Sequence, residues 1–167
     1  MAVRFETLIE NHHDEIFTYL WRLLGGQRCA DVGRGVEDLV QDVFMRAYEA
    51  FPNLRPDSNH RAWLYKIATH RAFTKLRRAK LQREKFALLK NSQVAQANFT
   101  VSVNNAADLR AAIEQLTPKQ KACVTLRYFN DLDYAAIAAI VGCSALSARA
   151  NVSHALRQLG KIMKESV

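Results

Sequence analysis

Seven basic residues stand between positions 60 and 80 without one acidic residue among them. They are Arg61, Lys66, Arg71, Lys75, Arg77, Arg78 and Lys80. A block of cations without counter-charges repels itself and usually has an anionic partner, so this stretch predicts binding to the phosphates of a nucleic acid. A solvated basic helix face is the alternative, because exposed runs of lysine and arginine are common.

The segment EDLVQDVFMRAYEAF, residues 37–51, is acidic although the chain has a formal net charge of +8. Asp38, Asp42 and Glu49 recur at intervals of four and seven, which predicts one solvent-facing stripe of a helix. Spacings of three and four predict the opposite, buried face, made of Leu39, Val40, Val43, Phe44, Ala47, Tyr48 and Phe51. An acidic stripe beside a basic helix suggests two partners of opposite charge.

The C-terminal segment 132–159 predicts a helix-turn-helix, in which Asp133 caps the first helix and Gly142 forms the turn. The second helix runs from about Ser144 to Leu159, and its predicted buried residues are Ala148, Val152, Leu156 and Leu159. Amide, guanidinium and hydroxyl groups on its other side are the types that read base edges. The candidates are Ser144, Ser147, Arg149, Asn151, His154 and Arg157. An ordinary helical hairpin is the alternative.

Helical periodicity elsewhere positions these groups on an all-α fold. It predicts helices at about 5–24, 37–51 and 60–81, separated by a glycine-rich connection at 25–35 and a proline-containing one at 52–59. Residues 82–105 lose the strong periodicity and become polar, and an extension of the third helix into the start of this stretch is the alternative. From residue 106 the pattern resumes, and Thr117 before Pro118 marks another helix start. We therefore expect two small helical domains, 1–81 and 106–167, joined by a flexible linker at 82–105.

Several classes of protein do not fit this sequence. No apolar run reaches the roughly 20 residues of a membrane span, and acids and histidines come too early for a secretory signal. The three cysteines, Cys29, Cys123 and Cys143, are too far apart in sequence for a zinc motif and are expected to be free thiols. No nucleophile–base arrangement or phosphate-binding loop is present. We expect a cytoplasmic protein without catalytic activity, metal, cofactor, small-molecule substrate or membrane insertion.

Three stretches in this order resemble bacterial RNA polymerase sigma factors of the extracytoplasmic-function type, in the sigma-70 family. They are DLVQDVFMRAYEAF, HRAWLYKIATHRAFTKLRRAK and LTPKQKACVTLRYFNDLDYAAIAAIVGCS, and the resemblance covers roughly residues 5–80 and 109–160. It implies that the N-terminal domain is similar to region 2, which binds core polymerase and the −10 promoter element. The C-terminal domain would be similar to region 4, which binds the −35 element through the helix-turn-helix candidates above.

The resemblance also implies roles for individual residues and partners. Asp38, Gln41 and Asp42 would dock onto the clamp helices of the largest polymerase subunit, with the flap of the second-largest subunit as a further contact. Residues implied at the −10 element are Asn53, His60, Arg61, Lys66, His70, Arg71, Lys75, Arg77 and Arg78. Trp63 and Tyr65 are candidates for stacking on bases, but Trp63 lies on the apolar stripe and is expected in the core. An anti-sigma factor is the implied regulator.

This chain departs from the family pattern at several DNA-facing positions. His70 stands where asparagine is common, Thr74 where aspartate is common, and SARAN at 147–151 where the recognition helix often reads TVKSR. The promoter sequence therefore stays open. Two other functions also stay open: a stand-alone helix-turn-helix regulator, and a sigma-mimicking decoy that binds an anti-sigma factor without DNA. A helical enzyme is the least favoured alternative. The composition of the linker allows the two domains to pack together or to stay apart.

Overall fold

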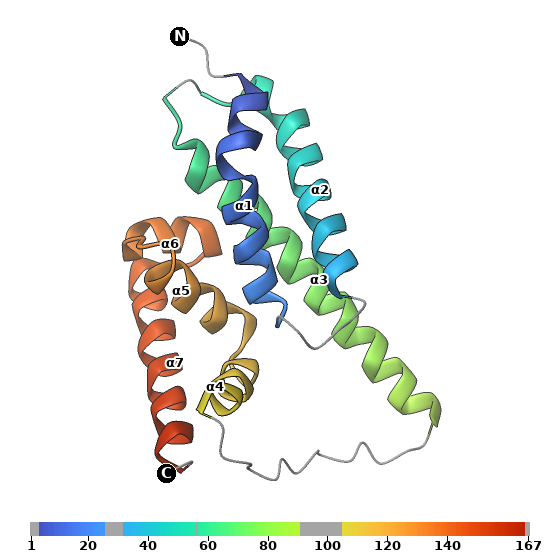
Figure 1. The fold of residues 1–167 in the computed structure, drawn as a ribbon, viewed down its shortest axis with the longest axis vertical. Helices are drawn as coiled ribbons and strands as arrows, with labels where there is room; N and C mark the ends of the chain where they lie inside the picture. The colour runs from blue at the N-terminus through green and yellow to red at the C-terminus, as the bar shows by residue number, and fades with distance from the viewer. Residues whose placement is uncertain (1–3, 26–31, 56, 91–104, 166–167) are drawn as a thin grey trace.

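The computed structural model describes residues 4–25, 32–55, 57–90 and 105–165, and within these ranges it contains helices and no strand. The N-terminal half consists of α1 (Phe5–Leu23), α2 (Val32–Ala50), the short 3₁₀ helix η2 (Phe51–Asn53) and α3 (His60–Lys90). The C-terminal half consists of α4 (Asn105–Glu114), α5 (Pro118–Tyr128), α6 (Tyr134–Val141) and α7 (Ala145–Glu165). The all-α prediction is confirmed (Figure 1).

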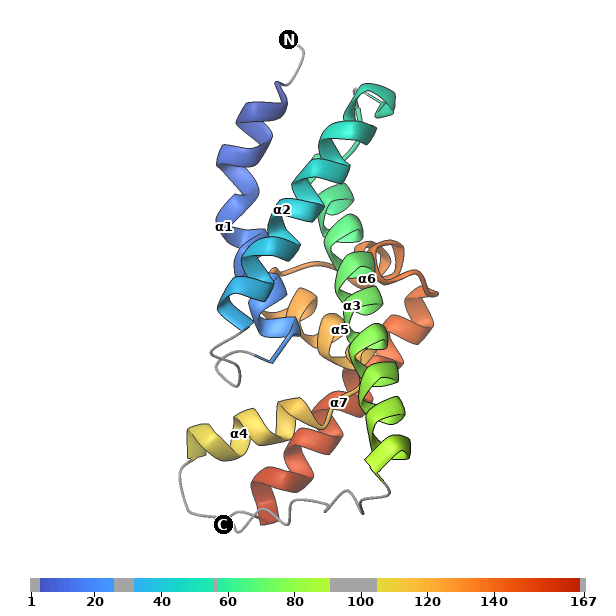
Figure 2. The ribbon, with the colours of Figure 1, turned by 90° about the vertical axis from the view of Figure 1, so that its right-hand side faces the viewer.

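Helices α1, α2 and α3 pack side by side as a three-helix unit (Figures 1 and 2). Most of the predicted apolar face of α2 is buried, from Leu39 to Ala47. Tyr48 is an exception: it is 65% exposed, and its ring lies edge-on to Phe5 at 5.3 Å. It occupies the border of the apolar face, so its ring is covered on one side only. Phe51 is half-buried for the same reason.

Helix α2 starts at Val32, inside the stretch that glycines predicted to be a connection. The prediction was wrong there because a glycine in a helix costs only about 1 kcal/mol relative to alanine. Gly35 also has a packing role. A Cβ at this position would lie 3.0 Å from Nζ of Lys75, which donates a hydrogen bond to the Gly35 carbonyl oxygen at 2.6 Å.

The C-terminal half starts its helices as the sequence predicts. Thr117 and Gln120 form a reciprocal capping box at the start of α5, with Pro118 in the first turn. Asp133 caps α6 by accepting a hydrogen bond from the Ala136 amide at 2.7 Å. Gly142 ends α6 with a φ of 76°, a left-handed conformation that glycine adopts without strain.

Helices α6 and α7 meet at a bend of 97°, the geometry of a helix-turn-helix. Ala148 and Val152 are buried as predicted. Leu156 is 43% exposed and Leu159 is half-buried, so the prediction for Leu156 was wrong. The small Ala155 takes the core position instead. By length and apolar content, no single helix in the described ranges qualifies as a membrane span, although the bent pair α6–α7 does when both are counted together.

The two halves pack against each other, which the sequence left open. Helix α6 lies against α3 and α5 lies against α1, and one continuous apolar core runs through both halves (Figures 1 and 2). Helix α3 continues past residue 81 to Lys90, an extension that the sequence left open. Its last turns project from the bundle, and residues 80–86 are all exposed. The remainder of the predicted linker, residues 91–104, lies outside the described residues.

Candidate nucleic-acid interface

The basic face of α3 is largely open to solvent. Five of the residues predicted to meet the −10 element are exposed along this helix: Lys66, His70, Lys75, Arg77 and Arg78. Asn53 is exposed at the end of η2, and the half-buried His60 starts α3 with its ring 6.1 Å from Phe51. Exposed cations on one helix fit the tracking of successive phosphates.

Arg61 differs from the other predicted phosphate ligands because it has an internal partner. Its Nε donates to Oε1 and Oε2 of Glu15 on α1 at 3.2 and 3.0 Å. Burial by itself lowers the pKa of Arg61, but the hydrogen bond and charge of Glu15 outweigh burial and raise it. Nδ1 of His12 is also 2.5 Å from Oε1 of Glu15. The guanidinium of Arg61 therefore ties α3 to α1, and its predicted contact with a phosphate stays a prediction.

Trp63 and Tyr65, the two candidates for stacking on bases, differ in burial: Trp63 packs against the core from a half-buried position, whereas Tyr65 is fully buried. Tyr65 is 0% exposed, with its ring edge-on to Tyr19 at 5.1 Å, so stacking on a base is excluded in this arrangement. Burial and the neighbouring Glu15 raise the pKa of Tyr65 far above its ordinary value. Trp63 is half-buried and lines a cleft. Tyr65 is enclosed because α3 is covered on two sides, by α1 and α2 and by α6.

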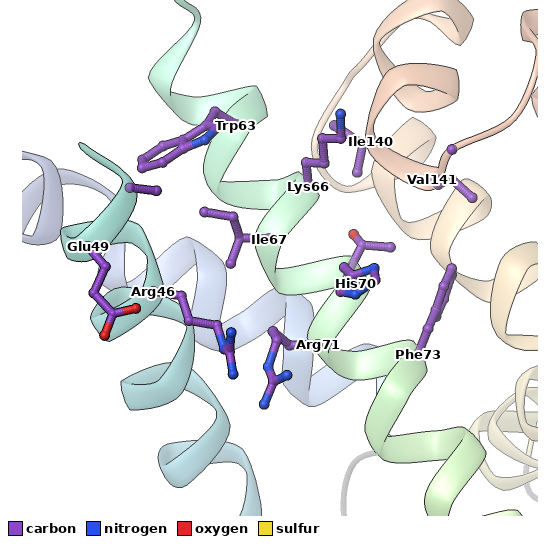
Figure 3. A pocket seen from close by; sticks show the side chains of 13 residues that line it. Arg46, Glu49, Trp63, Lys66, Ile67, His70, Arg71, Phe73, Ile140 and Val141 are labelled. Atoms are coloured by element: carbon purple, nitrogen blue, oxygen red, sulfur yellow. The ribbon is translucent and has the colours of Figure 1, made fainter. Parts of the chain in front are cut away.

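That cleft lies between α2, α3 and α6 and has a volume of about 710 Å³. Trp63, Lys66 and His70 come from α3, and Ile140 and Val141 come from α6 (Figure 3). Cationic groups beside aromatic rings are what single-stranded nucleic acid needs, since the cations meet phosphates and the rings meet bases. The cleft therefore brings Lys66, His70 and Arg71 of the predicted −10 surface together with a wall from the other half of the chain.

The predicted polymerase-docking residues lie together on α2, but not in equivalent surroundings. Asp38 and Gln41 are exposed, whereas Asp42 is half-buried. Asp42 accepts hydrogen bonds from Nε of Arg71 on α3 and, at 3.3 Å, from Nε of Arg46. Figure 3 shows the side chains of Arg46 and Arg71 extending on the same side of the cleft. The prediction of a uniformly solvated acidic stripe was therefore wrong at Asp42.

Helix α7 presents the residues predicted to read the −35 element. Ser144, Ser147, Arg149, His154 and Arg157 are exposed, and Asn151 is half-buried. Ser144 caps the helix: its Oγ accepts from the Ser147 amide at 3.1 Å and donates to the Ser147 hydroxyl at 3.0 Å. The guanidinium carbon of Arg149 lies 5.8 Å from the centre of the Tyr134 ring, which restricts its orientation.

No pattern in the sequence indicated two residues that join the halves, Phe129 and Asn130, because their partners Arg22 and Tyr65 are distant in the chain. Glu15 has a local partner, His12 three residues before it, and a distant one, Arg61 on α3. Within the described ranges there is no group of three or more potential metal ligands. Cys123 is buried and Cys143 half-buried, both as free thiols, and Cys29 lies outside the described residues.

These features define a helical DNA-binding protein whose C-terminal half is a helix-turn-helix. Residues 8–82 match the family described as Sigma-70 region 2, and residues 106–159 match Sigma-70, region 4. The two matches cover more than half of the chain. The chain belongs to the sigma-70 family of RNA polymerase sigma factors and is of the extracytoplasmic-function type. It is therefore a transcription initiation factor that directs core RNA polymerase to promoters.

Individual relatives and solved structures agree with this assignment. The RNA polymerase sigma factor YlaC of Bacillus subtilis is 28% identical over 96% of this chain and 92% of its own length. The ECF RNA polymerase sigma factor SigE of Mycolicibacterium smegmatis is 26% identical over 93% of this chain, which spans 60% of that protein. The sigma factor RpoE of Bartonella quintana, solved with the anti-sigma factor NepR, has a similar fold, with a TM-score of 0.71, 22% identity and 96% coverage of both chains.

Proposed function

We propose that the two halves divide the work of promoter recognition at the boundaries expected from the sequence. Residues 1–81 bind core polymerase through α2 and the −10 element through α3, and residues 106–167 bind the −35 element through α7. The main support for this division is that the neighbouring helices α2 and α3 expose different charges. Exposed Asp38 and Gln41 lie on α2, whereas the exposed cations lie on α3. A negative surface suits a cationic protein partner, and a positive one suits DNA.

At the −10 element, the protein supplies binding energy and no chemistry. Opening DNA costs on the order of 1.4 kcal/mol per base-pair step, so binding to the separated strand has to offset that cost. Lys66, His70, Arg77 and Arg78 are available for phosphates, and Trp63 at the cleft is available for an unstacked base. RNA synthesis itself is performed by the polymerase, so we propose that this chain is not an enzyme.

The partners follow from this division. Core RNA polymerase binds α2 through its clamp helices, and its flap binds the C-terminal half. Promoter DNA binds α3 and α7. We also propose control by an anti-sigma factor, because similarly folded sigma factors have been solved in complex with such proteins, as in the pair RpoE and NepR. These partners place the activity in the cytoplasm, where the polymerase works.

In vitro transcription tests the proposal directly. Purified core polymerase is incubated with fragments of the source genome, with and without this protein, and transcript starts are mapped. We expect new, discrete start sites only when the protein is present. A stand-alone regulator would instead bind duplex DNA in a gel shift without core polymerase and would add no start sites. A decoy would bind neither core polymerase nor DNA.

A further inference from the structure

The exposed side of α7 carries a large apolar residue among its polar ones. Leu146 is the second residue of this helix and is 79% exposed. Ala148 and Val152 are buried and face the other helices of the C-terminal half. Because a helix turns by about 100° per residue, Leu146 lies on the opposite side, together with the exposed Arg149 and Arg157.

The surroundings of Leu146 indicate what kind of partner covers it. A single exposed leucine is common and needs no function. Leu146 is not isolated, because the exposed Ala150 follows four residues later on the same side and extends the apolar surface. A leucine left in water gains stabilisation when a partner covers it. The cations beside it, Arg149 and Arg157, favour an anionic partner over an apolar protein surface.

The first turn of α7 holds Leu146 in a fixed position. Oγ of Ser144 accepts a hydrogen bond from the Ser147 amide at 3.1 Å, and the Ser144 carbonyl oxygen accepts one from the Ala148 amide at 2.9 Å. In a helix-turn-helix, the N-terminal residues of the second helix are those that reach base edges in the major groove. Leu146 therefore lies in a rigid turn at the place from which side chains contact bases.

One group on the base edges suits an apolar side chain. In the major groove, thymine presents its C5-methyl group, whereas the other groups that distinguish the bases are hydrogen-bond donors and acceptors. We infer that Leu146 reads a thymine of the −35 element by packing on this methyl group, an inference that rests on the proposed function of α7. Four helical residues span about 6 Å and base pairs are about 3.4 Å apart, so Ala150 is placed to meet a neighbouring pair.

Removal of one methyl group from DNA tests the contact. The full chain is assembled with core polymerase, and bound sequences are selected from duplexes randomised at the −35 element. In the selected duplex, each thymidine of either strand is then replaced in turn by deoxyuridine, which pairs in the same way but lacks the C5-methyl group. We expect one replacement to weaken binding by about fourfold, which is the value of one buried methyl group.

Variants of Leu146 separate reading of the methyl group from a structural role in α7. A structural defect lowers the affinity for both DNAs alike, so the ratio of the two affinities is the measured quantity. We expect the ratio to fall from about four in wild type to about one in Leu146→Ser, and to be kept in Leu146→Met, which retains an apolar side chain. Leu88→Ser, at an 83% exposed position near the end of α3, is the matched control and should keep the wild-type ratio.

The outcomes that contradict this inference are distinct. A selected −35 element made of G·C pairs alone would overturn it, and so would equal ratios in wild type and Leu146→Ser. Weaker assembly of Leu146→Ser with core polymerase at an unchanged ratio would assign the leucine to a protein contact instead. Failure of the proposed function would appear separately, because wild type would then select no −35 sequence and produce no new start sites.

Discussion

Asp42 on α2 accepts a hydrogen bond from Nε of Arg71 on α3, so a predicted polymerase-docking residue and a predicted DNA-binding residue are partners within the free protein. Arg46 shares the same carboxylate. The pair holds α2 against α3 and orients both helices. A substitution at Asp42 therefore alters the predicted DNA-binding surface as well, and a substitution at Arg71 alters the predicted docking surface. A binding defect of either variant has to be compared with its measured stability.

The Asp42–Arg71 pair should contribute measurably to stability. Both side chains are partly exposed, so water and salt screen the pair, and we expect a coupling of about 1 kcal/mol or less. Asp42→Asn, Arg71→Met and the double variant are compared by urea unfolding. A matched pair on the surface, Arg4 with Glu6, serves as the control and should show weaker coupling. Additive effects of Asp42→Asn and Arg71→Met would contradict the pairing.

Asp38 is the better test of docking because it is exposed and does not hold the helices together in the way that Asp42 does. We expect Asp38→Arg to weaken binding to core polymerase by at least about tenfold, since it places a cation against a cationic partner. The thermal midpoint should stay within about 2 °C of wild type, as is usual for surface substitutions. Glu10→Arg makes the same charge change on α1. If both variants bind core polymerase equally well, the docking site is not on this stripe.

Lys66 should act as a phosphate ligand in the promoter complex. Replacement by glutamine removes one cation, and the slope of log K against log salt should decrease by about 0.7 to 0.9. The loss of affinity should be similar for different promoter sequences, because a phosphate contact carries no base information. Arg4→Gln, also an exposed cation, gives the control. An unchanged salt slope for the Lys66 variant would show that its ammonium group does not meet DNA.

Asn151 should influence which −35 sequence is preferred. It lies on the side of α7 that we propose to face DNA, at a position where the resemblance to the family implies that arginine is common. Asn151→Arg exchanges an amide that suits adenine for a guanidinium that suits guanine, and such a contact discriminates by about 1–3 kcal/mol. Selection of active promoters from a library randomised at the −35 element measures the change. Identical preferences for the variant and wild type would show that residue 151 reads no base.

The sequence predicted what depends on local rules, and it missed what depends on long-range packing. Caps at Thr117 and Asp133 and the turn at Gly142 were confirmed because each is decided within a few residues. The sequence did not predict that Tyr65 is buried and Trp63 only half-buried, because a helix covered on two sides has no single apolar stripe. Glu15 and Asn130 have partners 46 and 65 residues away, so no spacing pattern could indicate them. The site residues on exposed helix faces were recognised through the family resemblance and still await the tests above.

The buried Cys123 should make the folded protein sensitive to alkaline pH. Burial raises the pKa of its thiol to about 12, above the ordinary value near 9. Between these values the unfolded chain loses the proton and the folded chain keeps it, so the free energy of unfolding should fall as pH rises, by up to about 1.4 kcal/mol per pH unit. Urea unfolding at pH 8.5 and 10 measures this fall. Cys123→Ala should show a smaller fall than wild type, whereas Cys143→Ala, at a half-buried position, gives the control. Equal pH dependence of wild type and Cys123→Ala would show that this thiol is not protected by the fold.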